Sequence, residues 1–395
     1  MLLTISEIIH SSWFYWTLTI IYFATIMSVV IIVVSENRNP VKSLAWLTVL
    51  LVVPVFGLVL YIVFGRNIRN THIVSRRNRR LLRKLENINN PPDAQWPKSQ
   101  QATQIIQMAK KLTSATLYSG NDATIYSEGV DKFEQLLADI RAARHYINVQ
   151  YYIFRGDKIG RRVQQELMKK AREGVKVKVI YDHVGSFRTP SKFFKEMQEA
   201  GVETHPFFKV VFPWFGTHVN WRNHRKVVII DGEIGYVGGM NIADRYVEGY
   251  KRSVWRDNHV RIEGPAVAAL QSSFSVDWTF LDKPLLTMTG SPQTQDANMH
   301  MLLMTSGPTS QWSNIAMLYN HAIAGARKRV FIQTPYFLPT EGLLRTLQAS
   351  ALAGVDVRVM VPRHSDSSLL TYASGAYFAG GMRGGMKILQ FGPGM

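Results

Sequence analysis

Residues 224–241 are the part of the sequence whose residue types and spacing could carry out chemistry. They read HRKVVIIDGEIGYVGGMN, with the spacing H-x-K-x4-D-x6-G-G-x-N. His224 and Lys226 are two residues apart, so on a strand their side chains project from the same face. A neutral imidazole could attack a phosphorus atom there while the ammonium group balances charge on the non-bridging oxygens, which is phosphoryl transfer without a metal. A bare His-x-Lys would fit a solvated pair on an exposed strand, but the complete spacing is far more demanding and favours the functional interpretation.

The rest of the motif predicts the turn and the backbone that position these groups. Asp231 and Gly232 form the Asp-Gly pair typical of a tight hairpin, which would send the chain back as EIGYVGG. Gly238 and Gly239 permit the backbone to approach a ligand closely. The amide of Asn241 would then lie beside the bound group. We therefore expect a strand, a tight turn and a second strand around the site.

Composition limits the remaining possibilities. The 395 residues include 46 Lys and Arg against 28 Asp and Glu, which gives a formal net charge of +18, and they include no cysteine. The length allows two or three domains. The lack of cysteine excludes a disulfide framework, a thiolate nucleophile and a Cys-ligated zinc or iron–sulfur site. The positive charge predicts an anionic partner.

Two uncharged stretches near the N-terminus predict a transmembrane hairpin. Residues 13–34 and 44–64 contain no Asp, Glu, Lys or Arg, and each is long enough as a helix to cross a ~30 Å hydrocarbon core. The alternative for the first stretch is a signal peptide, but residues 1–12 carry no Lys or Arg. The alternative for the second is a buried core helix, but it has no polar face. Pro54 and Gly57 are expected to kink the second helix.

A basic run follows the second stretch and predicts the orientation of the chain. Residues 66–84 carry eight Lys and Arg and no acidic residue, whereas the loop between the two stretches offers only Arg38 and Lys42. By the positive-inside rule, the large C-terminal part is cytoplasmic. The run could also attract anionic lipid, or it could be a topology signal alone. We do not expect it to bind nucleic acid, because it would be fixed beside the bilayer.

The remaining chain predicts an α/β fold. Helical patterns at 130–144 and 159–173 alternate with extended patterns at 146–154 and 175–181, which favours an α/β sheet. A second copy of the same order follows, in which the corresponding residues are Gln150 and Gln333, Gly174 and Gly354, and Gly201 and Gly385. Three blocks in the same order indicate an internal duplication rather than a chance recurrence of α/β patterning.

These patterns predict two tandem modules after the hairpin, the second of them incomplete. The expected ranges are 1–65 for the two transmembrane helices, 66–118 for the basic juxtamembrane segment and linker, 119–282 for the first module with the motif, and 299–395 for the second module. The stretch 283–298 would connect the modules.

These features resemble the phospholipase D superfamily and, within it, the bacterial cardiolipin synthases. The likeness covers nearly the whole chain and includes the hairpin, YINVQYYIFRGD, VKVIYDHVGS, the motif at 224–241, WRDNHVRIEGPAV, SGPTS and TPYFLP. The resemblance implies that two phosphatidylglycerol molecules become cardiolipin and glycerol by a ping-pong route. It also implies that no cofactor or divalent metal is used. Together with the two uncharged stretches and the basic run, it predicts a multi-pass protein of the bacterial inner membrane with its catalytic part in the cytoplasm.

The resemblance assigns roles to residues of the motif. His224 would be the nucleophile that forms a phosphatidyl-histidine, Lys226 and Asn241 would hold the phosphate, and Asp231 would help to order the site. A carboxylate would orient the imidazole, and Glu248 and Asp257 are the candidates for it. A surface salt bridge is the alternative for both.

One feature departs from the family pattern. Superfamily members build one active site from two such motifs, the second histidine serving as general acid, and this sequence contains one motif. The other histidines that could replace it, His259, His321 and His364, have no Lys two residues on, and we expect them to be structural or surface residues. The second copy stops where its motif should begin, so we expect a C-terminally truncated chain that is inactive alone.

Other functions stay open beside a phosphatidyltransferase. Two chains could each contribute one motif, although most of a second module is already present here. The protein could bind anionic lipid without catalysis, or it could hydrolyse phospholipid, if water rather than a lipid hydroxyl reaches the phosphohistidine. A nuclease is compatible with the charge, but two membrane spans favour lipid. The oligomeric state and the acyl-chain preference are left open.

Overall fold

The computed structural model describes residues 12–35, 40–61, 99–113, 115–209, 222–249, 255–281, 283–284, 286, 295–297, 299–307, 310, 312–392 and 394–395. The predicted basic run at 66–84 and most of the predicted connection at 283–298 lie outside these residues. The chain divides into an N-terminal unit, Met1–Thr71 with Val210–Trp221, and a larger unit, His72–Lys209 with Arg222–Met395.

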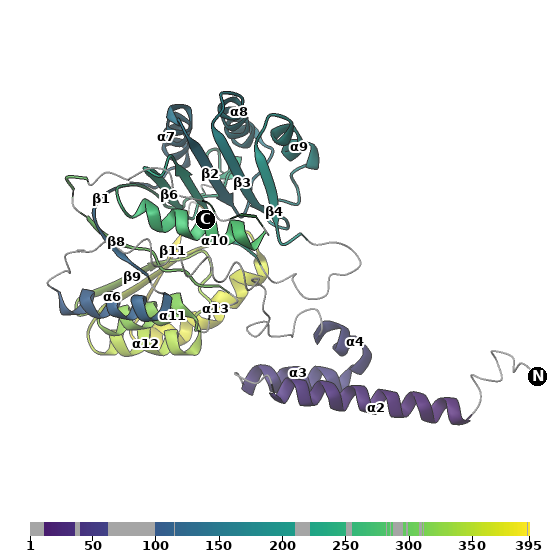
Figure 1. The fold of residues 1–395 in the computed structure, drawn as a ribbon. Helices are drawn as coiled ribbons and strands as arrows, with labels where there is room; N and C mark the ends of the chain where they lie inside the picture. Colours follow the sequence, from purple (N-terminus) through teal and green to yellow (C-terminus); the bar gives the residue numbers. More distant parts are fainter. Residues whose placement is uncertain are drawn as a thin grey trace, which may run out of the picture. The chain divides into compact units, whose positions relative to one another are not determined.

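The described residues of the N-terminal unit form the helices α2 (Ser12–Ser35), α3 (Pro40–Val52) and α4 (Pro54–Leu60) (Figure 1). The stretch predicted as one kinked helix at 44–64 is thus two helices, because Pro54 has no N–H to continue α3 and is favoured at the first turn of α4. Among the described residues, no helix has the length and hydropathy that a membrane crossing requires. The two predicted spans are therefore not confirmed.

An eight-stranded mixed sheet forms the first part of the larger unit, in the order β4-β3-β2-β5-β6-β7-β1-β8. Its strands are β1 (Leu117–Tyr126), β2 (Tyr146–Tyr151), β3 (Lys176–Asp182), β4 (Glu203–Phe207), β5 (Val227–Ile230), β6 (Ile234–Gly238), β7 (His259–Glu263) and β8 (Met299–Leu302). The neighbours β2, β3 and β4 are parallel, and every pairing from β2–β5 to β1–β8 is antiparallel. The predicted α/β sheet is confirmed, with an antiparallel half added to it.

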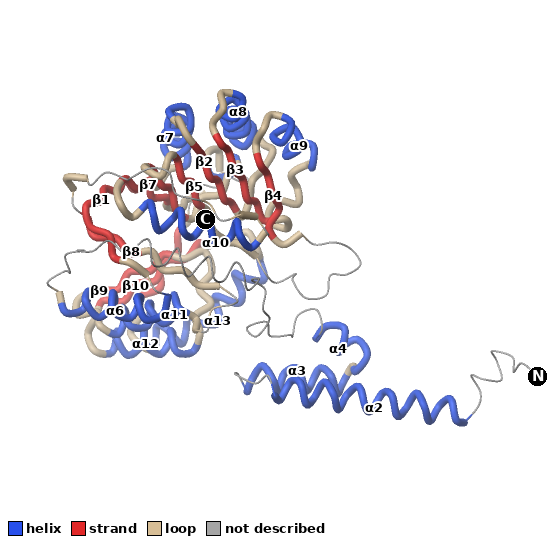
Figure 2. The backbone as a smooth tube through the Cα atoms, in the orientation of Figure 1, coloured by secondary structure: helices blue, strands red, loops and turns tan. Residues whose placement is uncertain are grey.

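Helices cover both faces of this sheet (Figures 1 and 2). Helices α7 (Gly129–Ala142), α8 (Lys158–Arg172) and α9 (Ser191–Glu199) pack on one face, where Leu137, Leu167 and Phe193 meet Val149 of β2 in one buried cluster. Helix α10 (Val267–Phe280) packs on the other face, where Phe274 and other α10 side chains meet β5 in a second cluster. Burial of these apolar side chains is what holds the three layers together.

A separate three-stranded parallel sheet follows, in the order β11-β10-β9. Its strands are β9 (Arg329–Gln333), β10 (Asp356–Pro362) and β11 (Lys387–Phe391), and its helices are α11 (Asn314–Ala324), α12 (Glu341–Leu352) and α13 (Ser368–Arg383). Leu347 of α12 is buried against Val357 and Val359 of β10 in a third apolar cluster. The early helix α6 (Gln100–Thr113) joins this part, and Gln101 donates a hydrogen bond to the carbonyl of Ala322 in α11.

The parallel strands of the two sheets are alike in order and register. Gln150 pairs with Ile180 in the first sheet as Gln333 pairs with Met360 in the second. The glycines that precede the second and third parallel strands have matching left-handed φ values, +90° at Gly174 and +91° at Gly354, then +93° at Gly201 and +85° at Gly385. Only glycine adopts this conformation freely, so each of these positions needs one.

Candidate active site

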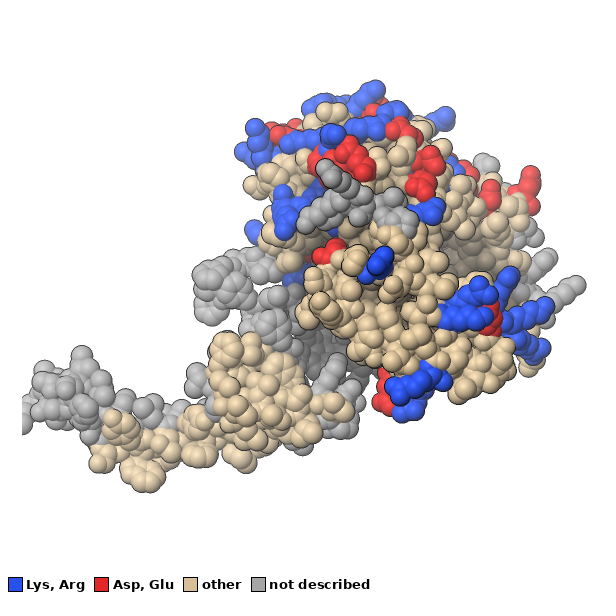
Figure 3. All heavy atoms as spheres, turned by 180° about the vertical axis from the view of Figure 1, so that it is seen from behind, with Lys and Arg blue, Asp and Glu red and all other residues tan. Residues whose placement is uncertain are grey.

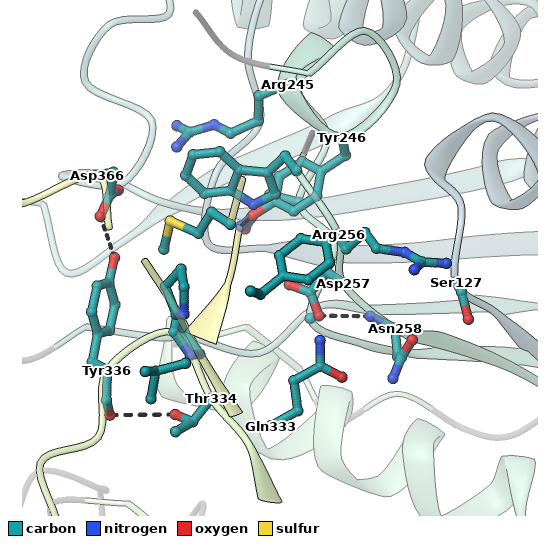
Figure 4. A pocket seen from close by; sticks show the side chains of 18 of the residues that line it. Ser127, Arg245, Tyr246, Arg256, Asp257, Asn258, Gln333, Thr334, Tyr336 and Asp366 are labelled. Carbon is teal, nitrogen blue, oxygen red and sulfur yellow. Dashed lines mark hydrogen bonds between the residues drawn. The ribbon is translucent and has the colours of Figure 1, made fainter. Parts of the chain in front are cut away.

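A pocket of about 620 Å³ lies in the larger unit and is lined by residues from both sheets (Figure 4). Three of the predicted site residues, His224, Lys226 and Asn241, line it. Gln333 of β9 and Phe391 of β11 line it from the other side. The pocket thus lies at the carboxyl ends of parallel strands, which is where open α/β sheets bind ligands.

His224 is exposed to the pocket and is held by an aromatic contact. Its ring stacks on that of Tyr152, with the ring centroids 3.9 Å apart and the planes inclined by 24°. Partial removal of the ring from water by the surrounding protein lowers the pKa of His224 to about 4, and the positive charge of Lys226 contributes to the same shift. The imidazole is therefore uncharged at neutral pH, which is the form that can act as a nucleophile.

Lys226 lies in the same pocket but is buried, with 7% of its surface exposed. Its Nζ donates a hydrogen bond of 2.6 Å to the backbone carbonyl of His224 and lies 5.5 Å from the ring centroid of Tyr152. Burial lowers the pKa of Lys226 to about 8, and the negative charge of Asp257 opposes that shift. At neutral pH the ammonium group is charged and can hold an anionic phosphate.

The structure corrects one detail of how these two residues are placed. We expected His224 and Lys226 on a strand, but β5 begins at Val227, and both residues lie in the segment that leads into it. Their side chains still reach the same pocket. The segment is fixed by hydrogen bonds rather than by strand pairing.

Two buried carboxylates, which the sequence reasoning missed, fix this segment. The Oδ2 atom of Asp277 in α10 accepts hydrogen bonds from the side chains of Gln150, Asn223 and Arg225, each 2.5–2.7 Å long. Asp182, at the end of β3, accepts one of 3.0 Å from the backbone N–H of Asn223. A carboxylate directly after a buried parallel strand is a signal that could have identified Asp182. Nothing in the local sequence of α10 distinguishes Asp277.

Asn241 lies at the pocket with its amide engaged by the protein. Its Oδ1 accepts a hydrogen bond of 3.0 Å from the backbone N–H of Ile153, and its Nδ2 donates one of 2.7 Å to the hydroxyl of Tyr246. An amide nitrogen has two hydrogens, so one remains available for a ligand.

Asp231 does not line the pocket. It occupies the predicted hairpin turn between β5 and β6, with φ of +53° followed by +74° at Gly232, as a type I′ turn requires. Its carboxylate accepts hydrogen bonds from the backbone N–H groups of Arg144, His145 and Tyr146, at 2.7–2.8 Å. Asp231 thus fastens the turn to the start of β2.

The two candidates for orienting the imidazole are separated by their positions. Glu248 forms an exposed ion pair of 2.8 Å with Lys158 and does not line the pocket. Asp257 lines the pocket, and its Oδ1 accepts a hydrogen bond of 2.7 Å from the backbone N–H of Asn258. A Cβ atom on Gly239 would lie 1.9 Å from that same oxygen, so Asp257 can occupy this place only because residue 239 is glycine.

The other histidines differ in their surroundings. His259 is completely buried, and neither of its ring nitrogens has a hydrogen-bond partner among the described residues. His364 is exposed, and His321 lies in α11. None of the three lines the pocket. Within the described part of the chain, no group of three His, Cys, Asp or Glu residues could hold a metal ion.

Comparison with known proteins identifies the family. The family described as "Cardiolipin synthase, PLD-like domain" matches residues 136–278 and 319–393, and the one described as "Phospholipase_D-nuclease N-terminal" matches residues 20–66. Among solved structures, the phosphatidylserine synthase of Haemophilus influenzae resembles this fold with a TM-score of 0.52 at 14% identity, over 74% of this chain and 78% of that one.

Relatives similar in sequence agree with this assignment. The chain is 36% identical to the major cardiolipin synthase ClsA of Bacillus subtilis, over 94% of this chain and 80% of that protein. It is 33% identical to the cardiolipin synthase of Alkalihalophilus pseudofirmus, over 99% of this chain and 80% of that protein. The chain belongs to the cardiolipin synthase family of the phospholipase D superfamily and is an enzyme of the phosphatidyltransferase type.

Proposed function

We propose that this enzyme transfers a phosphatidyl group from one phosphatidylglycerol to another through His224, giving cardiolipin and glycerol. The observation that carries the proposal is the presence, in one pocket, of an imidazole with a pKa of about 4 and a buried ammonium group with a pKa of about 8. Between these pH values the nucleophile is unprotonated while the phosphate-binding cation keeps its charge.

The reaction has two steps. In the first, a ring nitrogen of His224 bonds to phosphorus as the bond from phosphorus to the glycerol oxygen breaks, and the glycerol oxygen takes a proton from water. In the second, a hydroxyl of another phosphatidylglycerol bonds to phosphorus, the nitrogen–phosphorus bond breaks, and the hydroxyl proton passes to the hydroxide formed earlier. Lys226 and the free amide hydrogen of Asn241 balance the negative charge of the phosphate oxygens in both steps.

The source of the protons limits the rate of this scheme. Among the described pocket residues His224 is the one imidazole, and the sequence contains one His-x-Lys-x4-Asp motif. Loss of a positioned general acid costs about 10²- to 10⁴-fold. We therefore propose that the chain alone turns over slowly or not detectably, although its first step can still occur.

The covalent step can be tested without turnover. The full chain in detergent would be incubated with phosphatidylglycerol labelled in its acyl chains, and acid-labile label on the protein would be measured. We expect label on the unaltered chain and none on His224→Ala. Label that persists in His224→Ala would refute the nucleophile assignment. Cardiolipin as the released product supports transfer, whereas phosphatidic acid would indicate the alternative function, phospholipid hydrolysis. Addition of EDTA should not change either result, because the proposed chemistry uses no metal.

We further propose that the N-terminal unit holds the enzyme at the bacterial inner membrane, with the catalytic part in the cytoplasm. Exposed apolar side chains run along α2, among them Trp16, Ile20, Phe23, Met27 and Ile31. In the face seen in Figure 3, the described surface of this unit shows no Lys, Arg, Asp or Glu, while both signs of charge are spread over the larger unit. Contact of such a surface with lipid would remove it from water. The phosphodiester available to the membrane-held enzyme would then be that of a lipid rather than that of a nucleic acid.

Introduced cysteines can test this placement because the chain has none of its own. Ser12→Cys and Ser35→Cys mark the two ends of α2, and Gln100→Cys marks the start of α6. In intact cells, a membrane-impermeant maleimide should not label Gln100→Cys until the cells are opened. Labelling of Gln100→Cys in intact cells would place the catalytic part outside. Labelling of exactly one of the two α2 positions would show that α2 crosses the membrane.

A further inference from the structure

Arg245 is a positively charged pocket residue that the proposed chemistry does not use. It lies in the short 3-10 turn Asp244–Tyr246 and is partly buried. Its guanidinium carbon lies 4.7 Å from the ring centroid of Trp255. It forms no ion pair or hydrogen bond with any residue that the structure describes, so its N–H groups have no protein acceptor there.

The other charged groups around Arg245 are already engaged. The carboxylate of Asp244 accepts hydrogen bonds of 3.1 and 2.8 Å from the backbone N–H groups of Lys158 and Ile159. Asp366 accepts a hydrogen bond from the hydroxyl of Tyr336. None of these groups neutralises Arg245.

A second arginine of the pocket provides a contrast. Arg256 forms a 2.9 Å ion pair with Glu128. In Figure 4, Arg245 and Arg256 extend toward opposite sides of the pocket, with Arg256 directed toward Ser127. One arginine is therefore satisfied by the protein, and the other is left for a ligand.

Arg245 lies on the side of the pocket where Asp366 and Tyr336 are seen in Figure 4. Burial and Asp366 raise the pKa of Tyr336, at the wall contributed by the second sheet, and the positive charge of Arg245 opposes that shift. The pKa of His224, in contrast, is lowered by burial and by Lys226. The pocket therefore has two separate cationic positions, Lys226 beside the nucleophile and Arg245 toward the second sheet.

We propose that Arg245 binds the phosphodiester of the lipid that accepts the phosphatidyl group. This inference rests on the proposed transfer between two phospholipids, which brings two phosphates into one pocket. The acceptor's own phosphate is three carbons from its attacking hydroxyl, so it must lie near the first phosphate without sharing its site. A guanidinium group held over an indole ring by a cation–π contact still has N–H groups for two parallel hydrogen bonds to phosphate oxygens.

Competition between two acceptors tests the proposal. Once the phosphatidyl group is on the enzyme, phosphatidylglycerol and free glycerol can both accept it, and only the former carries a phosphate. Mixed micelles with labelled glycerol would give the ratio of cardiolipin to newly labelled phosphatidylglycerol. We expect Arg245→Gln to lower that ratio about tenfold, the loss expected for a charge-assisted contact, and Arg245→Lys to lower it less. The control is Arg345→Gln, which removes an exposed arginine of α12 outside the pocket. An unchanged ratio in Arg245→Gln would overturn the proposal.

A binding measurement decides the matter even if no product forms. sn-Glycerol 1-phosphate would be titrated calorimetrically into the full-length Lys226→Gln chain and into the Lys226→Gln/Arg245→Gln chain. With the first phosphate position disabled, we expect binding to the single variant and at least tenfold weaker binding to the double variant. Equal binding would overturn the role of Arg245. Absence of the acid-labile label from the unaltered chain would instead contradict the proposed function and would leave the outcome of this titration intact.

Discussion

Replacement of Asp231 separates a structural role from a catalytic one. The carboxylate accepts three backbone hydrogen bonds, from residues 144, 145 and 146, and stands at a left-handed position of the hairpin. Arg144 and His145 are exposed, so water can replace their partner, whereas Tyr146 is buried and its N–H would remain without one. The hairpin and the start of β2 should therefore lose stability together when the carboxylate is removed.

The three substitutions Asp231→Asn, Asp231→Gly and Asp231→Ala should differ in a defined order. Loss of the acceptor costs about 2 kcal/mol at the buried N–H and about 1 kcal/mol for the two exposed ones together. Alanine adds about 1 kcal/mol because it disfavours φ of +53°, which glycine tolerates. Asparagine tolerates the turn and keeps Oδ1, the acceptor for His145 and for the buried Tyr146, so about 1 kcal/mol should be lost. We expect destabilisation of about 1, 3 and 4 kcal/mol for Asn, Gly and Ala.

Thermal unfolding of the full chain in detergent, followed by tryptophan fluorescence, measures this order. At about 2–4 °C per kcal/mol, Asp231→Ala should lower the midpoint by roughly 10 °C. Asp296→Ala is the matched control, because this exposed aspartate makes no hydrogen bond or ion pair with the described residues. A variant that unfolds at the unaltered midpoint but no longer forms the phosphatidyl-enzyme would refute the reasoning and place Asp231 in the chemistry.

Three further predictions concern the pocket itself. The rate of phosphatidyl-enzyme formation should fall as the pH rises through about 8, where Lys226 loses its proton. In Lys226→Arg this decline should move to higher pH. A decline that stays near pH 8 in the variant would show that another group causes it. Gly239→Ala should abolish the adduct because its Cβ would lie 1.9 Å from Asp257, and the additional change Asp257→Ala should restore part of it in the same labelling assay. Asp277→Ala should slow single-turnover adduct formation about tenfold, because it removes the 2.5 Å contact to Arg225 that fixes the segment before β5. Equal rates would show that the segment keeps its conformation without Asp277.

Local patterns predicted the elements that depend on neighbouring residues. The helix expected at 130–144 is α7, the strand expected at 175–181 is β3, and the Asp231–Gly232 pair forms the expected hairpin. Each of these depends on side-chain periodicity or on turn chemistry within a few residues. The sequence therefore contained enough information for them.

Contacts between distant residues could not be predicted in this way. The partners of Asp231 are more than 80 residues away along the chain, and those of Asp277 more than 50. The antiparallel half of the first sheet likewise depends on the pairing of β5 with β2, whose residues are far apart along the chain. His224 and Lys226 were predicted from their spacing. The contact between Tyr152 and His224 was not, because residue spacing does not indicate which distant ring stacks on a side chain.

The low pKa of His224 has a consequence at a lipid surface. An anionic bilayer with a surface potential of about −30 mV concentrates protons about threefold over the bulk solution. An ordinary histidine would then be substantially protonated in mildly acidic solution, and its nucleophilic form would be depleted beside the lipid that the proposed reaction consumes. With a pKa of about 4, His224 keeps its lone pair through such changes. Burial and the positive charge of Lys226 thus make the proposed nucleophile indifferent to the acidity of the lipid surface.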